Sequence, residues 1–313
     1  VQTCALPISK EEQRTKIAIE SKKPAPAEEI VLGVLGAGNY AQAVFLPTIT
    51  GVGGVQMKTI VSAAGTNAAF SAGKFHFQFA GSKEEDIFED AAINTVAILS
   101  PHCQHARQVI DALRSHKNVY CEKPLAIHES ELKNVAKELA KKEPAVLMVG
   151  FNRRFSPFGK TLKDFLSQRT EPLYAYYRIN AGELPLSHWQ HDLKKGGGRI
   201  VGEGCHFIDF VSFLVGETPI SVWSQSLPDG GKYNRDNVHI TCEFPDGSIG
   251  SIAYLANGDK SFSKEYLEVF CGGKIGILED FKNLTLVEDG HQKEFHARFS
   301  QDKGHRNAWQ AFL

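Results

Sequence analysis

The sequence lacks the features of a nucleic-acid-binding, membrane or metal-binding protein. Lys and Arg number 35 against 36 Asp and Glu, and the basic residues are scattered, so the basic surface of a nucleic-acid-binding protein is not expected. No apolar run approaches the ~20 residues of a membrane-spanning helix. The six cysteines lack the short paired spacing of a zinc knuckle or a disulfide framework. We therefore expect a cytoplasmic protein that binds small molecules and holds no metal.

The two ends of the sequence do not resemble natural termini. Residues 1–8, VQTCALPI, contain no start signal and resemble a translated sequencing adapter, so we expect a non-native leader. Residues 9–29 are charged and contain prolines, which is typical of a linker, and Lys16 to Ile19 could be the last strand of an upstream domain. The final residues, KGHRNAWQAFL, stop inside a helical pattern, which predicts truncation at the C-terminus.

Residues 30–150 alternate between strand and helix patterns. The apolar run IVLGVL is followed by a glycine turn, a helical pattern and a second β-branched run, which together make a βαβ unit. Two further strand and helix pairs follow, and the run AVLMVGF ends the series. This alternation predicts a Rossmann-type, doubly wound parallel sheet with helices on both faces.

Residues 151–313 are richer in strand patterns. Several such runs follow one another, and the pair Asp246 and Gly247 accepts the positive φ angles of a hairpin turn. We predict a second, α+β domain with a mainly antiparallel open sheet. Two domains agree with the length, because 313 residues exceed the usual size of one hydrophobic core.

The segment GAGNYA joins the first predicted strand to the first helix. Gly36 permits a tight turn, Gly38 lets a pyrophosphate approach the backbone N–H groups, and Ala41 lets the helix pack closely on the strand. This pattern predicts a dinucleotide site. Ser62 and two alanines stand where an acid would favour NAD, and no arginine there favours NADP. The expected cofactor is therefore NAD or NADP.

Four segments follow the glycine turn in a fixed order and carry a resemblance to a known family. They are SPHCQHA at 100–106, CEKPLA at 121–126, GFNRRFSPF at 150–158 and GGGRIVGEGCHFIDF at 196–210. They resemble the Gfo/Idh/MocA oxidoreductases, which include glucose-fructose oxidoreductase and inositol dehydrogenase. The resemblance implies reversible hydride transfer between NAD(P) and a secondary alcohol of a sugar, a sugar derivative or a cyclitol.

The resemblance also bears on assembly. The resemblance implies that the second domain serves substrate binding and oligomerisation. Its open sheet forms the oligomer interface in similar proteins, which implies a homo-oligomer. The segment NAGELPLSHWQHD, which ends at Asp192, resembles a subgroup fused behind a medium-chain dehydrogenase-like half. That likeness implies a missing N-terminal partner domain.

The family's E-K-P motif places its lysine, here Lys123, near the nicotinamide and the substrate hydroxyl. A lysine at that place can hydrogen-bond the reacting oxygen, and the peptide bond before Pro124 is expected to be cis. The residues expected to bind the cofactor belong to the glycine turn, the end of the second strand and the loops of the later motifs: Gly36, Gly38, Asn39, Tyr40, Ala41, Ser62, Ser100, Pro101, His105, Glu122, Lys123 and Pro124.

A helix after the three glycines would place His206 and Asp209 on one face. Histidine titrates near neutrality, so His206 suits taking the proton of a substrate alcohol, and Asp209 could orient its ring. We therefore expect Lys123, His206 and Asp209 to be catalytic. The family carries an aspartate four residues before this histidine, where this chain has Gly202; the adjacent Glu203 lies ~100° around the helix.

An aromatic and two imidazoles precede the glycines, and Trp189 with His188 would make a platform for a sugar ring. The residues expected to bind the substrate are Asn152, Arg153, His188, Trp189 and His206. A zinc site of His188, His191 and His206 is not favoured, because the spacing fixes no tetrahedral geometry. Two other functions stay open: a redox-assisted NAD-dependent glycosidase, and a non-catalytic dinucleotide-binding module, which Gly202 makes credible.

Overall fold

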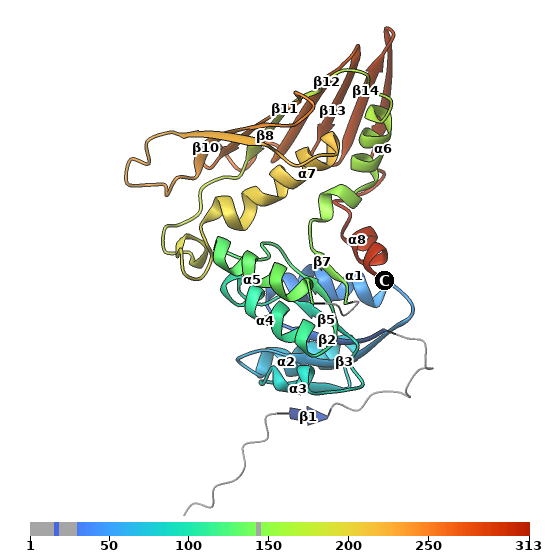
Figure 1. Ribbon diagram of the computed structural model, residues 1–313, viewed down its shortest axis with the longest axis vertical. Helices are drawn as coiled ribbons and strands as arrows, with labels where there is room; N and C mark the ends of the chain where they lie inside the picture. Colours follow the sequence, from blue (N-terminus) through green and yellow to red (C-terminus); the bar gives the residue numbers. More distant parts are fainter. Residues whose placement is uncertain (1–15, 19–29, 142–144) are drawn as a thin grey trace, which may run out of the picture.

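The computed structural model describes residues 16–18, 30–141 and 145–313. The leader expected at residues 1–8 and most of the linker expected at 9–29 lie outside them. Within that linker, β1 (Lys16–Ala18) runs antiparallel to β4 (Phe79–Gly81) at the edge of the first sheet (Figure 1). Among the described helices, none combines the length and apolar character needed to cross a lipid bilayer.

The first sheet has the strand order β1-β4-β3-β2-β5-β6-β7, and its neighbouring strands are parallel except β1 and β4. Side chains of β2 alternate between two core clusters, with Leu32 and Val34 on one face and Leu35 on the other. The doubly wound Rossmann prediction is confirmed. The elements are β2 (Ile30–Leu35), η1 (Ala41–Phe45), α1 (Leu46–Thr50), β3 (Val55–Val61), α2 (Thr66–Phe75), α3 (Glu85–Phe88), β5 (Thr95–Ile98), α4 (His102–Arg114), β6 (Asn118–Cys121), α5 (Glu129–Leu139) and β7 (Leu147–Val149).

The second sheet has the strand order β15-β14-β13-β12-β8-β11-β10-β9 and is antiparallel except for the pair β8 and β11. Helices α6 and α7 cover one face, and no helix of the described residues covers the other (Figure 1). The predicted open sheet is confirmed. The elements are η2 (Asn152–Phe155), α6 (Pro157–Leu166), β8 (Tyr174–Asn180), η3 (Trp189–His191), η4 (Ile200–Gly204), α7 (Cys205–Val215), β9 (Ser221–Ser226), β10 (Asn237–Glu243), β11 (Ile249–Leu255), β12 (Glu265–Cys271), β13 (Lys274–Glu279), β14 (Asn283–Glu288), β15 (His291–His296) and α8 (His305–Phe312).

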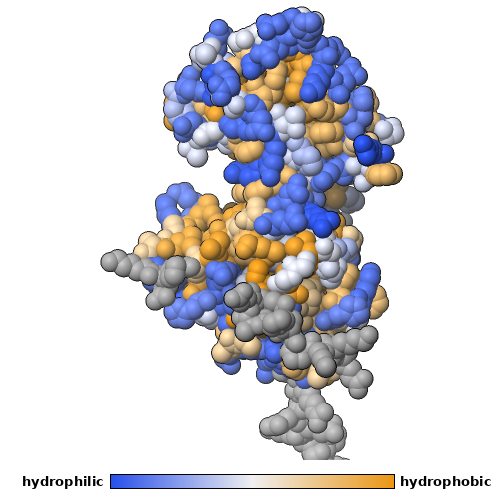
Figure 2. All heavy atoms as spheres, turned by 90° about the vertical axis from the view of Figure 1, so that its right-hand side faces the viewer, coloured by the Kyte–Doolittle hydropathy of each residue, from blue (hydrophilic) through white to orange (hydrophobic). Residues whose placement is uncertain are grey.

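The last helix, α8, returns to the first domain. Trp309 is 1% exposed and lies in the core of that domain, with its ring against Phe45 at 5.3 Å and Tyr120 at 5.4 Å between centroids. The predicted division at residue 150 assigns this helix to the second domain, whereas its apolar side packs on the first. Figure 2 shows two lobes joined at a narrower waist, with the surface hollowed beside it.

We expect Trp309→Ala to lower the free energy of unfolding by about 3–5 kcal/mol, because it removes a buried aromatic ring and leaves a cavity. Urea unfolding followed by circular dichroism measures the change. Phe299, which is 99% exposed, supplies the control: Phe299→Ala should leave the stability nearly unchanged. Equal effects of the two substitutions would contradict the assignment of α8 to the first core.

Candidate functional site

The glycine turn after β2 has the geometry that a dinucleotide needs. Gly36 has φ +105°, and a Cβ atom there would lie 2.6 Å from the carbonyl carbon of Leu99, so the turn packs against the end of β5. A Cβ on Gly38 would meet no atom within 4 Å. A side chain at Gly36 would therefore clash with the neighbouring backbone. Gly38 leaves open space at the start of the following helix, where a phosphate fits.

The end of β3 offers a second feature that fits the cofactor. The hydroxyl of Ser62 is buried and has no hydrogen-bond partner among the described residues. A buried hydroxyl without a partner costs free energy unless a ligand or water satisfies it. Its place at the carboxyl end of the second parallel strand is where a dinucleotide's ribose lies in this fold. Asn39, also expected to bind the cofactor, is exposed in the turn.

Two other residues expected to bind the cofactor contact each other instead. The hydroxyl of Tyr40 donates a hydrogen bond to Glu122 Oε1 at 2.7 Å, and the hydroxyl of Tyr120 lies 3.5 Å from the same oxygen. Burial raises the pKa of Glu122. The side chains of Tyr40 and Glu122 therefore hold the glycine turn against the loop after β6, because both polar groups already have partners.

The residues Ser100, Pro101 and His105 form the start of α4, where they also bind the protein itself. The hydroxyl of Ser100 donates to Gln108, and Pro101 is the N-terminal cap of the helix. The ring nitrogens of His105 lie 2.7 Å from the carbonyl of Pro124 and 2.8 Å from that of Ser100. His105 thus joins the two loops and has no ring nitrogen left for a cofactor. The peptide bond between Lys123 and Pro124 is cis, as expected.

Lys123 lies against the helix that carries His206. Its Nζ donates a hydrogen bond of 2.7 Å to the carbonyl of Gly202, in the π-helical turn η4 just before α7. Single π-turns within helices occur frequently at functional sites. The positive charge of Lys123 also helps to lower the pKa of His206. The two side chains proposed for proton transfer are far apart in the sequence, and the fold brings them to the same place.

His206 is buried and neutral near pH 7. It is 7% exposed, its ring stands edge-on to Phe151 at 6.0 Å, and its Nδ1 has no hydrogen-bond partner in the described part of the chain. Burial, followed by the charges of Arg153 and Lys123, holds its pKa well below 6.5. A neutral imidazole can accept a proton, so the state needed of a general base is the one present at neutral pH.

The expected contact between His206 and Asp209 is not formed. Asp209 accepts two hydrogen bonds from the guanidinium of Arg154 on η2, one of them at 3.1 Å from Nε. Helical spacing put the two side chains on one face, but the arginine from another element binds the carboxylate. Asp209 therefore fixes α7 to η2, and the prediction that it orients the ring of His206 is wrong.

Two residues expected to bind substrate are also engaged within the protein. Nε and Nη2 of Arg153 each donate a 2.8 Å hydrogen bond to Glu265, and both side chains are nearly fully buried. Although burial alone would raise it, the guanidinium holds the pKa of Glu265 far below its usual range. The amide of Asn152 donates to the carbonyl of Lys303 at 2.8 Å. Both residues join η2 to the second domain and to the segment before α8.

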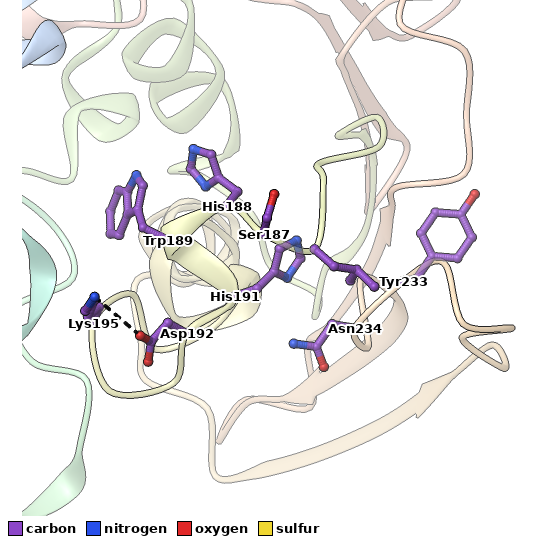
Figure 3. A pocket seen from close by; sticks show the side chains of 9 residues that line it. Ser187, His188, Trp189, His191, Asp192, Lys195, Tyr233 and Asn234 are labelled. Carbon is purple, nitrogen blue, oxygen red and sulfur yellow. Dashed lines mark ion pairs between the residues drawn. The ribbon is translucent and has the colours of Figure 1, made fainter.

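A cavity of about 550 Å³ lies beside the loop that carries Trp189 (Figure 3). Trp189 is 42% exposed, and its ring meets that of His102 edge-on at 4.8 Å. Asp192 and Lys195 form an ion pair of 3.9 Å at the rim. The cavity combines aromatic faces with hydrogen-bonding groups, and its lining is Leu186, Ser187, His188, Trp189, His191, Asp192, Lys195, Tyr233 and Asn234.

The alternative of a zinc site has no geometric support. His191 Nε2 lies 3.3 Å from the carbonyl of Leu184 and 3.7 Å from Asp236 Oδ2, so it faces its own loop and the residue before β10. Over residues 16–18, 30–141 and 145–313, no group of three His, Cys, Asp or Glu side chains is arranged to hold a metal ion.

Two histidines at the site were not predicted. His102 lies beside Gly202 and donates through Nδ1 to the carbonyl of Gly196 at 2.9 Å. His305, at the start of α8, has a ring 6.3 Å from that of Tyr40. Burial lowers the pKa of each to about 4. His102 stands within the segment at 100–106 that carries the resemblance, whereas no local pattern connects His305 to this place.

Both domains match known families. A family described as "Oxidoreductase family, NAD-binding Rossmann fold" (Gfo/Idh/MocA) matches residues 30–151, and "Oxidoreductase family, C-terminal alpha/beta domain" matches residues 170–309. An uncharacterized oxidoreductase, YrbE, from Bacillus subtilis is 23% identical over 83% of this chain and 76% of its own length. A myo-inositol 2-dehydrogenase from Thermotoga maritima is 26% identical over 68% of this chain and 65% of its own length.

Solved structures share the fold. A levoglucosan dehydrogenase in complex with NADH and levoglucosan superposes with a TM-score of 0.77 at 21% identity, over 91% of this chain and 88% of that chain. An oxidoreductase domain protein from Kribbella flavida gives a TM-score of 0.75 at 17% identity, over 91% and 89%.

The buried histidines predict that stability falls with acidification. His102, His206 and His305 have pKa values below 6.5 in the folded chain, so below pH 6.5 the unfolded chain binds protons that the folded chain does not. The free energy of unfolding should therefore drop between pH 7 and pH 5, by at most about 1.4 kcal/mol per pH unit for each histidine.

Urea unfolding at a series of pH values measures this slope. His102→Gln should reduce it, whereas the exposed His291→Gln should leave it unchanged. Glu122, whose raised pKa acts in the opposite sense above 4.5, is the same in both variants and cancels from the comparison. A slope that stays the same in His102→Gln would contradict the neutral, buried state of this ring.

Proposed function

Because the chain belongs to the Gfo/Idh/MocA family of NAD-binding oxidoreductases, we propose that it transfers hydride between NAD(P) and a secondary alcohol of a sugar, a sugar derivative or a cyclitol. The observation that carries the proposal is that the ammonium of Lys123 hydrogen-bonds the carbonyl of Gly202, four residues before His206, and helps to lower the pKa of His206. Relatives named myo-inositol 2-dehydrogenase and inositol 2-dehydrogenase, the latter from Rhizobium meliloti, and the fold shared with a levoglucosan dehydrogenase support the substrate class.

The glycine turn and Ser62 are the groups that would hold the dinucleotide. The open space at Gly38 and the unpartnered hydroxyl of Ser62 fit its pyrophosphate and ribose. When bound, the cofactor supplies the hydride acceptor or donor. The side chains of Tyr40, Glu122 and His105 act indirectly, because they hold the turn and the loop of Lys123 in place.

The proton work falls to His206 and Lys123. The neutral imidazole of His206 accepts the proton of the substrate hydroxyl during oxidation and returns it during reduction. The ammonium of Lys123 has three N–H donors, and Gly202 takes one. The remaining donors can bind the substrate oxygen and stabilise negative charge that develops on it. Asp209 is not part of this relay, since Arg154 holds its carboxylate.

The cavity beside Trp189 favours a neutral ligand. An indole face packs on the C–H face of a sugar, and the polar groups around it can hydrogen-bond hydroxyls. The charges at its rim, Asp192 and Lys195, pair with each other, so no net charge is offered to a phosphate or carboxylate. We therefore place the sugar or cyclitol between Lys123 and this cavity.

One observation favours the rival function of a dinucleotide-binding module without turnover. Position 202 carries no acid, and the nearby Asp209 is held by an arginine, so no carboxylate among the described residues hydrogen-bonds Nδ1 of His206. A redox-assisted glycosidase is the other rival. Product analysis separates the three, because only a dehydrogenase accumulates reduced cofactor, a glycosidase releases sugar without doing so, and a binding module does neither.

We expect wild-type protein to reduce NAD or NADP with at least one member of a polyol panel that includes myo-inositol and levoglucosan. His206→Asn and Lys123→Ala should each lower kcat by about 10²–10⁴-fold, the range for loss of general acid–base catalysis. In wild type, kcat should fall only at pH values well below 6.5, where His206 becomes protonated. Absorbance of the reduced nicotinamide measures both effects.

The exposed His76, which has a φ of +60°, provides the matched control. Asparagine tolerates that backbone conformation, so His76→Asn should keep wild-type kcat. Thermal shifts with each dinucleotide check that the catalytic variants still bind cofactor. Full activity of His206→Asn would contradict the role of His206 as the general base.

We also propose that the open face of the second sheet pairs with another copy of the chain. Large apolar side chains lie exposed there on four strands: Tyr174 on β8, Trp223 on β9, Ile249 on β11 and Phe270 on β12. Large apolar side chains exposed on one face of a sheet are typical of protein interfaces. The free cysteines among the described residues fit a reducing cytoplasm. The upstream dehydrogenase-like half stays a prediction.

Trp223→Glu should convert the oligomer into monomer, because it places a charge on that apolar face, on the edge strand β9. Light scattering coupled to size exclusion gives the mass of each variant. A substitution on an exposed site of the first domain, Phe70→Glu, should leave the mass of the wild-type assembly unchanged. A monomeric wild-type chain would contradict the interface.

A further inference from the structure

The missing side chain at position 202 makes room for His102. A Cβ atom built on Gly202 would lie 2.9 Å from Cε1 of His102 and 3.3 Å from its Nδ1, which is closer than such contacts occur. The amide nitrogen of Gln190 lies 3.5 Å from the same point. Two polar side chains from separate segments therefore occupy the space beside Gly202, on whose carbonyl Lys123 is held.

The hydrogen bonds of His102 fix which ring nitrogen is free. Nδ1 lies 2.9 Å from the carbonyl of Gly196, and a carbonyl can only accept, so Nδ1 carries the hydrogen. The ring is neutral near pH 7, so Nε2 is then a lone-pair acceptor. No described residue donates to it. The edge-on contact with Trp189 holds the ring in this orientation.

Gln190 complements this acceptor. Its side-chain amide has no hydrogen-bond partner among the described residues, and the backbone of Gln190 is held where it is by Gly196, on which a Cβ atom would lie 2.4 Å from the Cα of Gln190. A side chain with a free acceptor and one with a free donor therefore both lie beside Gly202, whose carbonyl binds the ammonium of Lys123. A hydroxyl can donate to one and accept from the other, as the hydroxyls of a polyol do.

We propose that His102 and Gln190 bind a hydroxyl of the substrate next to the reacting one, with His102 Nε2 accepting its hydrogen and the amide of Gln190 donating to its oxygen. The inference rests on the proposed function and specifies it. The two side chains would select a neutral vicinal diol, because an uncharged imidazole and an amide supply the hydrogen bonds to its hydroxyl. A substrate with a carbonyl or an ether at that position would leave Nε2 without a donor, which costs affinity.

The experiment compares His102→Phe, His102→Gln and Gly202→Ala with wild type, using the polyol that the panel identifies. Phenylalanine keeps a flat ring but removes the acceptor, and alanine adds the methyl group that displaces His102. Both should raise KM about tenfold or more with little change in affinity for NAD(P), and glutamine should restore part of the loss. The double variant Gly202→Ala with His102→Phe should lose no more than either single one, because both remove the same contact.

A second readout does not depend on turnover. In ¹⁵N spectra of the histidine side chains, His102 should appear as the neutral Nδ1–H form, and its Nε2 signal should shift when myo-inositol or levoglucosan is added with NADH. Unchanged KM in His102→Phe and Gly202→Ala, with an active wild type, would overturn this inference and leave the proposed function standing. An inactive wild type whose Nε2 signal also ignores both polyols would overturn both.

Discussion

The hydrogen bond from Lys123 to the carbonyl of Gly202 is the contact on which the arrangement of the site depends. It joins the loop after β6, in the dinucleotide-binding domain, to the turn before α7, in the second domain. An ammonium group is thereby held by a neutral carbonyl, so its charge stays available to a ligand. The same charge helps to keep His206 neutral, because two positive groups close together disfavour each other.

Around this contact, most polar side chains of the site are occupied in holding the backbone. Tyr40 and Glu122 fix the glycine turn, and Arg154 fixes α7 through Asp209. His105 joins the loop of Ser100 to the loop of Pro124. Groups without partners among the described residues include the hydroxyl of Ser62, Nδ1 of His206, Nε2 of His102 and the side-chain amide of Gln190. Supporting hydrogen bonds around a site of this kind help to position its free groups for selective binding.

Local sequence patterns predicted the features that depend on interactions between residues close together in the chain. The alternation of strands and helices, the glycine turn and the place of His206 on a helix follow from periodicity and backbone sterics, and the structure agrees. Partners that come from distant segments could not be predicted: helical spacing put Asp209 beside His206, but Arg154 binds it. Likewise, the gap left by Gly202 is visible in the sequence, but only the fold shows that His102 fills it. The amphipathic pattern of α8 indicates a buried side without saying which core it enters.

That return of α8 has a consequence for how the chain is made. The core between Phe45 and Tyr120 requires the indole of Trp309, which a ribosome adds only after the whole second sheet has been synthesised. Until Trp309 is synthesised, the apolar space beside Phe45 and Tyr120 in the nascent dinucleotide-binding domain lacks this ring. Domains generally fold as they leave the ribosome, but of these two lobes the one that is synthesised first completes its packing only after the second has been made.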